Sequence, residues 1–140
     1  MNADYLIIAA MLNFFAAAMH IAVIIGGANW YRFLGAGEEF AQMAERGSKH
    51  PAIVTAVIAS ILAIWGLYAL SGAGVIPQLP LLKPALIAIT SVYFLRGIGG
   101  LIAPFVSKHP QVTDNSLTFW IVSSFICLAY AGVHFVGFYY

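Results

Sequence analysis

Three ionisable side chains, His20, Arg96 and His134, lie inside long apolar stretches of the sequence. Such a side chain is costly in the hydrocarbon core of a membrane unless it is paired or hydrated. Histidine changes charge near neutral pH, whereas arginine keeps its charge at every physiological pH. These three residues are therefore the first candidates for a functional site, as titrating groups or as the ligand of an anion.

Depth in the membrane decides which polar side chains can share a site. A helix rises about 1.5 Å per residue, which puts His20 and Arg96 at one level on the side of the first loop. The same count puts His134 near Asn13 in the other half of the membrane. We therefore expect two clusters, an inner one around Arg96 and an outer one around His134. The predicted inner, ligand-binding cluster comprises His20, Arg96, Tyr93, Arg32, Glu38 and Glu39.

The charge of Arg96 gives the inner cluster its predicted chemistry. A permanent cation needs a first-loop glutamate, a backbone carbonyl or a bound anion, and the anion would be a lipid headgroup or a small solute. The alternative is that Arg96 snorkels, extending its head to phosphates at the membrane surface. A histidine beside Glu38 or Glu39 also offers the acid–base pair that a lipid-modifying membrane enzyme needs, but no catalytic residue is assigned.

The outer cluster is a polar stripe on one face of the last apolar stretch, at spacings of four, three and four residues. It comprises Ser123, Cys127, Tyr130 and His134, with Asn13 expected opposite. Such a stripe either lines a hydrated crevice or joins helix to helix through hydrogen bonds.

No cofactor or metal site is predicted, because no metal-binding, phosphate-loop or dinucleotide motif is present. Two membrane histidines suggest a haem with two histidine ligands. The depths of His20 and His134 differ by about 14 Å, too far for one iron. A haem would need one histidine and a second ligand from elsewhere, and this remains an alternative.

The elements that position these residues are membrane helices. The chain has 140 residues, of which 62% are hydrophobic and 8% charged. About 20 apolar residues cross a bilayer, which predicts four spans over about residues 5–28, 51–71, 83–104 and 116–139. Residues from about 38 to 46 predict a short helix in the membrane interface. The expected fold is an all-α, polytopic, up-down-up-down bundle in one domain, residues 1–140.

The positive charges of the loops predict the orientation. Arg32, Arg46 and Lys49 lie in the first loop and Lys108 in the third, whereas the second loop holds only Lys83. Loops one and three should face the cytoplasm, with both termini outside. The net charge of +1 gives no reason to expect a nucleic-acid partner.

The tetrapeptide Ser-Lys-His-Pro occurs at residues 48–51 and again at residues 107–110. It is either the trace of a duplicated two-helix hairpin or a pair of ordinary helix starts at the headgroup level.

The segment from His20 to Gly47, which includes Trp-Tyr-Arg-Phe-Leu-Gly-Ala-Gly-Glu at residues 30–38, resembles small four-span proteins of the bacterial inner membrane whose function is uncharacterised. The resemblance implies the layout and the bacterial inner membrane, and it implies no activity. The chain does not resemble the small multidrug transporters, which carry a glutamate in the first span.

These observations favour a non-enzymatic integral membrane protein. It would bind an anionic lipid or a small anion, assemble with itself or with a larger membrane complex, or do both. A homo-oligomeric transporter or channel with a titrating histidine is the first alternative. A membrane enzyme or haem-binding protein is the second.

Overall fold

The computed structural model describes residues 1–140 and contains only helices, with no strand. The long helices are α1 (Ala3–Gly26), α4 (His50–Gly72), α5 (Leu82–Val106) and α7 (Leu117–Tyr139), and the short ones are α2 (Ala28–Phe33), α3 (Glu38–Glu45) and α6 (Pro110–Thr113). Each of the four long helices is long and apolar enough to cross a membrane. The predicted fold class, all-α with four spanning helices, is confirmed. The ends of the long helices lie within two residues of the spans expected from the sequence.

Polar residues mark the beginnings of these helices. The side chain of Asn2 accepts a hydrogen bond from the backbone N–H of Tyr5, and Ser116 accepts one from Phe119. Each cap satisfies a backbone donor that the first turn leaves unpaired. Pro51 stands in the first turn of α4, where its missing N–H costs nothing.

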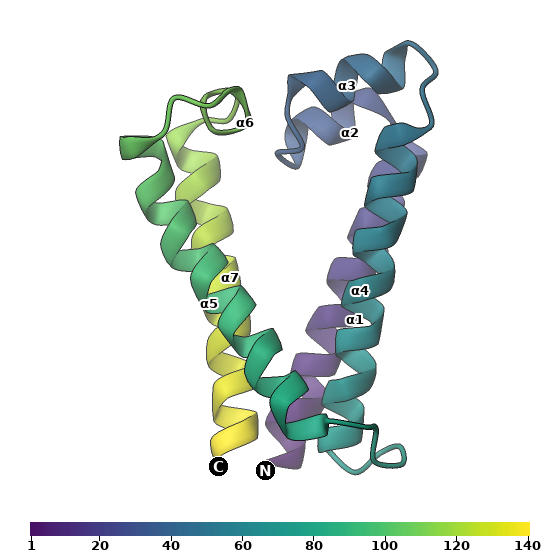
Figure 1. Cartoon of the computed structure of the whole chain (residues 1–140), viewed down its shortest axis with the longest axis vertical. Coiled ribbons are helices and arrows are strands. Elements are labelled where there is room, and N and C mark those ends of the chain that lie inside the picture. The colour runs from purple at the N-terminus through teal and green to yellow at the C-terminus, as the bar shows by residue number, and fades with distance from the viewer.

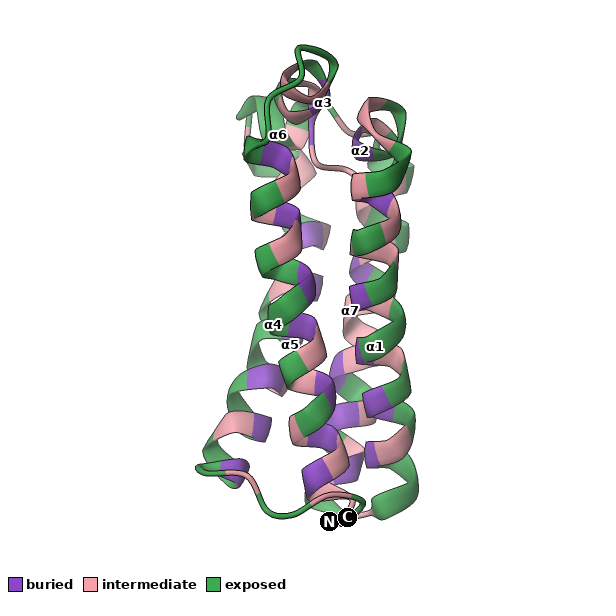
Figure 2. Cartoon of the chain, turned by 90° about the vertical axis from the view of Figure 1, so that its right-hand side faces the viewer, coloured by how far each residue is buried: buried purple, intermediate pink, exposed green.

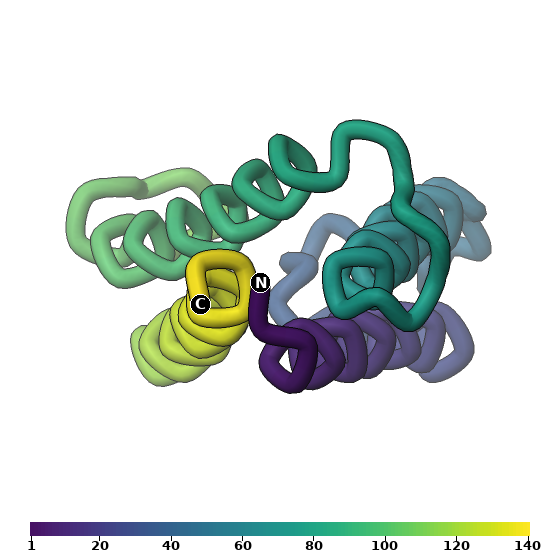
Figure 3. The backbone as a smooth tube through the Cα atoms, turned by 90° about the horizontal axis from the view of Figure 1, so that it is seen from below, coloured from purple at the N-terminus to yellow at the C-terminus, as the bar shows by residue number.

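The long helices form two hairpins that diverge like the arms of a V (Figure 1). The first hairpin pairs α1 with α4, and the second pairs α5 with α7. The narrow end of the V, here the terminal end, holds both chain termini, which lie close together in the view from below (Figure 3). There the backbone N–H of Asn2 donates to the carbonyl of Gly137 over 2.7 Å. The wide end, here the loop end, carries α2, α3 and α6.

Within each hairpin, a glycine lets the paired helices approach closely. A Cβ added at Gly97 of α5 would lie 2.6 Å from Cγ of Leu128 on α7. At Gly66 of α4 it would lie 2.8 Å from the ring of Phe14 on α1. Small residues of this kind are typical of helix pairs packed in a membrane.

The outer surface of the molecule is apolar. Only 26 of the 140 residues are buried, and many large hydrophobic side chains lie on the outer faces of the helices (Figure 2). Water would not solvate such a surface, whereas the hydrocarbon of a bilayer would. The exposed faces therefore agree with a chain that spans a membrane.

The two Ser-Lys-His-Pro segments share a serine hydrogen bond but differ in backbone conformation, because His50 is the first residue of α4 whereas His109 is extended and caps α6. The hydroxyl of Ser48 accepts from the backbone N–H of His50, and that of Ser107 accepts from His109, each over 3.3 Å. Each segment joins the two helices of one hairpin, and α1 and α5 both run toward the loop end (Figure 1). Duplication of a two-helix hairpin would produce this arrangement.

Candidate functional site

A buried hydrogen-bond network joins the two hairpins in the terminal half of the molecule. We call its four residues, Asn13, Tyr93, Tyr130 and His134, the polar joint. Asn13 donates through Nδ2 to the carbonyl of Ala9 over 3.0 Å and to Nε2 of His134 over 2.8 Å. The hydroxyl of Tyr93 donates to Oδ1 of Asn13. The exposed fractions of Asn13 and His134 are 0% and 1%, so these bonds are shielded from water and lipid.

The hydrogen-bond donors and acceptors of the polar joint determine which nitrogen of His134 carries a proton. The Ala9 carbonyl can only accept, so it fixes the amide of Asn13 with Nδ2 toward both Ala9 and His134. Nε2 of His134 must therefore accept, and the ring is neutral with its proton on Nδ1. Nδ1 is buried and has no hydrogen-bond partner.

Aromatic rings surround the joint. The ring of Tyr93 stacks on that of His134 at 5.6 Å and 24°, and it also contacts Tyr130 at 5.2 Å. Trp65 of α4 packs edge-on against Tyr93 at 5.3 Å. The hydroxyl of Tyr130 donates to the carbonyl of Leu12 over 2.9 Å. All four long helices thus contribute to this layer.

Arg96 occupies a second site, nearer the loop end, between α5 and α7. We call it the arginine site, and it comprises Arg96, Gly100, Trp120, Ser123 and Ser124. Nη2 of Arg96 donates to Oγ of Ser123 over 3.3 Å, and the guanidinium carbon lies 5.0 Å from the ring centre of Trp120. That distance is typical of a cation–π contact. Trp120 is itself held by its indole N–H, which donates to the carbonyl of Val112 over 2.9 Å.

Within the arginine site, Gly100 is packed tightly against Arg96 and Ser124. A Cβ added at Gly100 would overlap with both Nη1 of Arg96 and Oγ of Ser124. Both atoms are buried, and neither has a hydrogen-bond partner. Gly100 is therefore needed for the guanidinium to reach this position.

No carboxylate neutralises Arg96. The ion pairs of the molecule are those of Arg32 with Glu38 and Glu45, and none involves Arg96. Its contacts are a hydroxyl and an aromatic ring, which position the guanidinium but leave its positive charge uncompensated. Arg96 therefore carries a half-buried positive charge that no side chain of the protein neutralises.

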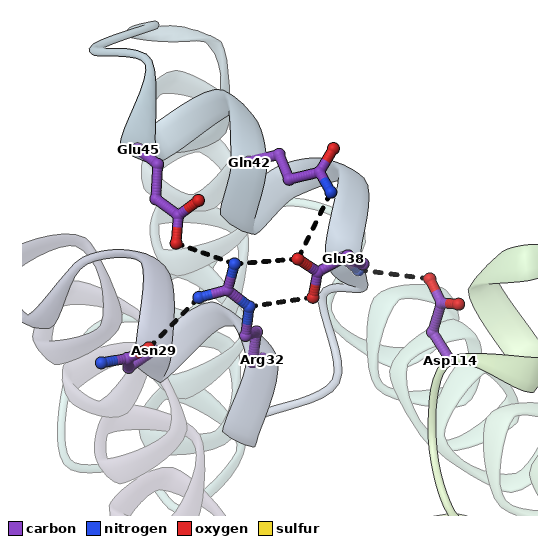
Figure 4. Close-up of polar contacts among 6 residues, drawn as sticks. All are labelled: Asn29, Arg32, Glu38, Gln42, Glu45 and Asp114. Carbon is purple, nitrogen blue, oxygen red and sulfur yellow. Dashed lines mark hydrogen bonds and ion pairs between the residues drawn. The ribbon is translucent and has the colours of Figure 1, made fainter.

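Arg32, by contrast, is fully engaged in the first loop (Figure 4). It binds both carboxylate oxygens of Glu38 over 2.8 Å and one oxygen of Glu45 over 2.8 Å. Hydrogen bonds from Arg32 hold the pKa of Glu38 below its ordinary value of 4.5. Hydrogen bonds that Arg32 donates to Glu38 and to Glu45, in that order of effect, raise the pKa of Arg32 above its ordinary value. Two carboxylates therefore neutralise Arg32, and it has no charge to offer an anion.

Hydrogen bonds between the loops join the hairpins a second time. Nε2 of Gln111 donates to the carbonyls of Gly35 and Ala36 over 3.1 and 3.0 Å. The backbone N–H of Glu38 donates to Oδ2 of Asp114 over 3.2 Å (Figure 4). A polar pocket of about 340 Å³ lies here, lined by Arg32, Gly37, Glu38, Asp114 and Asn115.

The structure does not bring the six residues of the expected inner cluster together. Arg32 and Glu38 pair in the first loop, whereas Arg96 bonds to α7. His20 contacts the carbonyl of Ala16 on its own helix through Nδ1 over 2.7 Å, and Glu39 makes no side-chain hydrogen bond or ion pair. Equal depth was the reason for grouping these residues, but the hairpins diverge at that depth (Figure 1).

Tyr93 belongs to the polar joint and not to the site of Arg96. It precedes Arg96 by three residues, and one turn of helix is enough to place its hydroxyl at the level of Asn13. The expected outer stripe is divided as well. Asn13, Tyr130 and His134 meet in or beside the joint, Ser123 bonds to Arg96, and Cys127 makes no hydrogen bond.

Several residues of these sites carried no signal in the sequence. Trp120 and Ser124 lie in the last apolar stretch, and the sequence predicted no role for either residue. Gln111 and Asp114 lie in the third loop, and no role was predicted for them. Their roles depend on which hairpin each one faces, and helical spacing does not contain that information.

The structure places the two membrane histidines apart. His134 is bonded to Asn13, and His20 lies about two turns farther along α1. No group of three His, Cys, Asp or Glu side chains is positioned to hold a metal ion.

No protein-family model, curated protein or solved structure matches this chain. The function is therefore inferred from the geometry of the polar joint and the arginine site.

Proposed function

We propose that this integral membrane protein is a non-enzymatic binding protein that holds an anionic lipid by its headgroup phosphate at Arg96. Four helices that are long and apolar enough to span a bilayer support an integral membrane protein. The main support for an anion at Arg96 is that its charge has no carboxylate partner.

The position of the guanidinium supports a lipid as the source of the anion. Arg96 reaches Trp120 and Ser123, which lie in the first two turns of α7, beside the loop end. In a span of this length, residues so close to the helix end lie near the headgroups. A lipid phosphate is available at that depth, and Arg binds phosphate well through its fork of N–H donors.

Snorkelling alone does not explain the fixed contacts of the Arg96 guanidinium. A snorkelling side chain extends freely into the interface and needs no fixed partners. Arg96 is instead held by Ser123, Trp120 and the close approach at Gly100. A positioned guanidinium loses less conformational entropy on binding than a free one.

The same proposal includes the orientation of the helices in the membrane and the membrane in which the protein lies. Loops one and three would face the cytoplasm of a bacterium, and both termini would face outward. The arginine site would then contact the inner leaflet of the inner membrane, where anionic lipids attract basic groups. Four helices with so much exposed apolar surface would also assemble with a second copy or with a larger membrane complex.

Native mass spectrometry of the detergent-purified protein tests the proposal. The wild type should retain phosphatidylglycerol and release phosphatidylcholine, whereas Arg96→Gln should release both. Arg46→Gln, which removes an exposed loop arginine with no side-chain hydrogen bond or ion pair, is the matched control and should behave as the wild type does.

Excess inorganic phosphate separates the two sources of an anion. If phosphate displaces the lipid or binds equally well alone, the ligand is a small anion and the lipid proposal is wrong. If Arg96→Gln retains phosphatidylglycerol as the wild type does, the arginine site has no part in binding.

A homo-oligomeric transporter or channel is the second candidate, because a neutral histidine lies buried where all four long helices meet. Flux of protons or anions into vesicles that stops on His134→Gln would favour it. A haem-binding protein would instead show a Soret band after purification, with His20 as the membrane histidine whose Nε2 makes no hydrogen bond within the protein.

A further inference from the structure

We propose that the polar joint is a proton-sensitive connection between the two hairpins, which we call the pin. Neutral His134 holds the hairpins together, and protonation of His134 lets them move apart. The proposal does not depend on lipid binding at Arg96, because it concerns the distance between the hairpins and requires no ligand.

The donor–acceptor arrangement of the joint carries the argument. Nε2 of His134 accepts from Nδ2 of Asn13 over 2.8 Å. A protonated imidazole has two N–H donors and no acceptor. An N–H on Nε2 would then point at the N–H of Asn13, and the bond would become a repulsive contact.

Asn13 has no way to adapt to the proton. Rotation of its amide would turn Oδ1 toward His134, but Oδ1 would then also face the carbonyl of Ala9, and two acceptors cannot bond to each other. The hydroxyl of Tyr93, which now donates to Oδ1, would also lose its acceptor. A buried polar group without a partner is costly, so either response weakens the joint.

The surroundings of His134 offer a proton no compensating charge. The ring of Tyr93 from α5 faces His134, and the titratable groups of α7 itself are Tyr130, one turn away, and Cys127, two turns away. From α1 the ring meets the neutral amide of Asn13, and α4 contributes Trp65 behind Tyr93. No carboxylate faces the ring, and the nearest permanent charge along α5, Arg96, is positive.

The polar joint also lies where few other bonds connect the hairpins, so its loss would change the distance between them. Hydrogen bonds between the hairpins occur at the terminal end, at the joint, and between the loops. Between the joint and the loops no hydrogen bond or ion pair crosses from one hairpin to the other, and this is the stretch that carries His20 and Arg96. The loop bonds are exposed to water and contribute little.

Distance measurement by pulsed electron paramagnetic resonance tests the pin in lipid nanodiscs. Spin labels are attached to cysteines introduced by Ile25→Cys on α1 and Val122→Cys on α7, in a Cys127→Ala background. Both positions are exposed on the outside, at 82% and 53%. Histidine in water changes charge at about pH 6.5 and burial disfavours the charged ring, so the distance is measured from about pH 8 down to about pH 4. Over that range the population with the longer distance should rise about tenfold relative to the population with the shorter one, as expected for the loss of one hydrogen bond.

Two variants assign the change to His134. His134→Gln offers an amide oxygen near the place of Nε2 and does not titrate, so its distance should stay short at every pH. His20→Gln removes the other membrane histidine and should keep the wild-type response. The proposal is wrong if the wild-type distance does not change with pH, or if His134→Gln still responds.

A measurement on the wild type covers the case in which His134→Gln does not fold. The 15N chemical shifts of His134 in selectively labelled protein should report a neutral Nδ1–H tautomer at neutral pH. Its protonation should then coincide with the change in distance. An Nε2–H tautomer at neutral pH, or a distance change while the ring stays neutral, would overturn the pin.

Discussion

Asn13 on α1 and His134 on α7 meet through a single hydrogen bond of 2.8 Å, although 121 residues separate them in the chain. Both side chains are buried, and the bond joins the two hairpins. Hydrogen bonds between membrane helices contribute on the order of 1 kcal/mol each. The joint is therefore a modest source of stability with a specific geometry, and this combination suits a contact that holds and releases.

Replacing Asn13 by leucine should destabilise the protein by about 1–3 kcal/mol, because Tyr93 and His134 would keep buried polar atoms without partners. Met11→Leu is the control, since Met11 lies on the same helix and is 66% exposed. Unfolding in mixed detergent micelles measures both variants. Equal stability of Asn13→Leu and Met11→Leu would mean that the joint contributes nothing.

Two neighbouring glycines of α5 give a matched test of the arginine site. Gly100→Ala would place a Cβ in overlap with both Arg96 and Ser124, whereas a Cβ at Gly99 meets nothing within 4 Å. We expect Gly100→Ala to cost about 1–3 kcal/mol, as overpacking does. Gly99→Ala should be neutral or slightly stabilising, by up to about 1 kcal/mol.

The same pair should differ in lipid retention. Gly100→Ala displaces the guanidinium and should reduce the bound phosphatidylglycerol seen by native mass spectrometry, while Gly99→Ala should retain it. If Gly100→Ala folds normally and binds lipid as well as Gly99→Ala does, the tight packing at Gly100 does not position Arg96 for binding.

The first loop should respond to acid in a way that depends on Arg32. Arg32 holds the pKa of Glu38 below 4.5, so the pair stabilises the loop at neutral pH and this contribution is lost as the pH falls through the lowered value. In Arg32→Gln this contribution is absent at every pH, so the loop should already exchange faster at neutral pH and should respond less to acid than the wild type does. Hydrogen exchange of residues 28–45 as a function of pH measures both effects.

Arg46→Gln serves as the control for the loop, because Arg46 makes no ion pair. Its exchange should match that of the wild type at every pH. If Arg32→Gln also matches the wild type, the ion pair does not hold the loop. The difference in stability should be small, because both side chains are partly exposed.

The predicted orientation can be tested by labelling single cysteines in whole cells, in a Cys127→Ala background. Arg46→Cys in the first loop should react only with a membrane-permeant reagent. Val75→Cys, which is 57% exposed in the second loop, should react with an impermeant one. The reverse pattern would place both termini in the cytoplasm and the arginine site in the outer leaflet.

The sequence was sufficient to predict the four long helices, because an apolar run of the right length and its flanking Pro, Ser and Gly residues are local signals. It also placed Asn13 and His134 at one depth, since a helix rises by a fixed amount per residue. The hydrogen bond between them agrees with that estimate.

Which neighbouring helix each side chain faces could not be predicted from helical spacing in the same way. His20 and Arg96 share a depth but lie on hairpins that diverge, and each bonds within its own hairpin. The angle between the hairpins depends on side-chain packing at the terminal end, such as the stacking of Tyr93 on His134. Such contacts join residues far apart in the chain, and the periodicity of a single helix does not specify them.

The most direct test of the proposed function is the dissociation constant for phosphatidylglycerol relative to phosphatidylcholine in the wild type, Arg96→Lys, Arg96→Gln and Arg46→Gln. A charge-assisted hydrogen bond contributes about 1.5–3 kcal/mol, so Arg96→Gln should bind the anionic lipid about tenfold or more weakly. Arg96→Lys should show an intermediate loss, and Arg46→Gln none. Equal preference for phosphatidylglycerol in the wild type and in Arg96→Gln would contradict the assignment of Arg96 as the ligand of the headgroup.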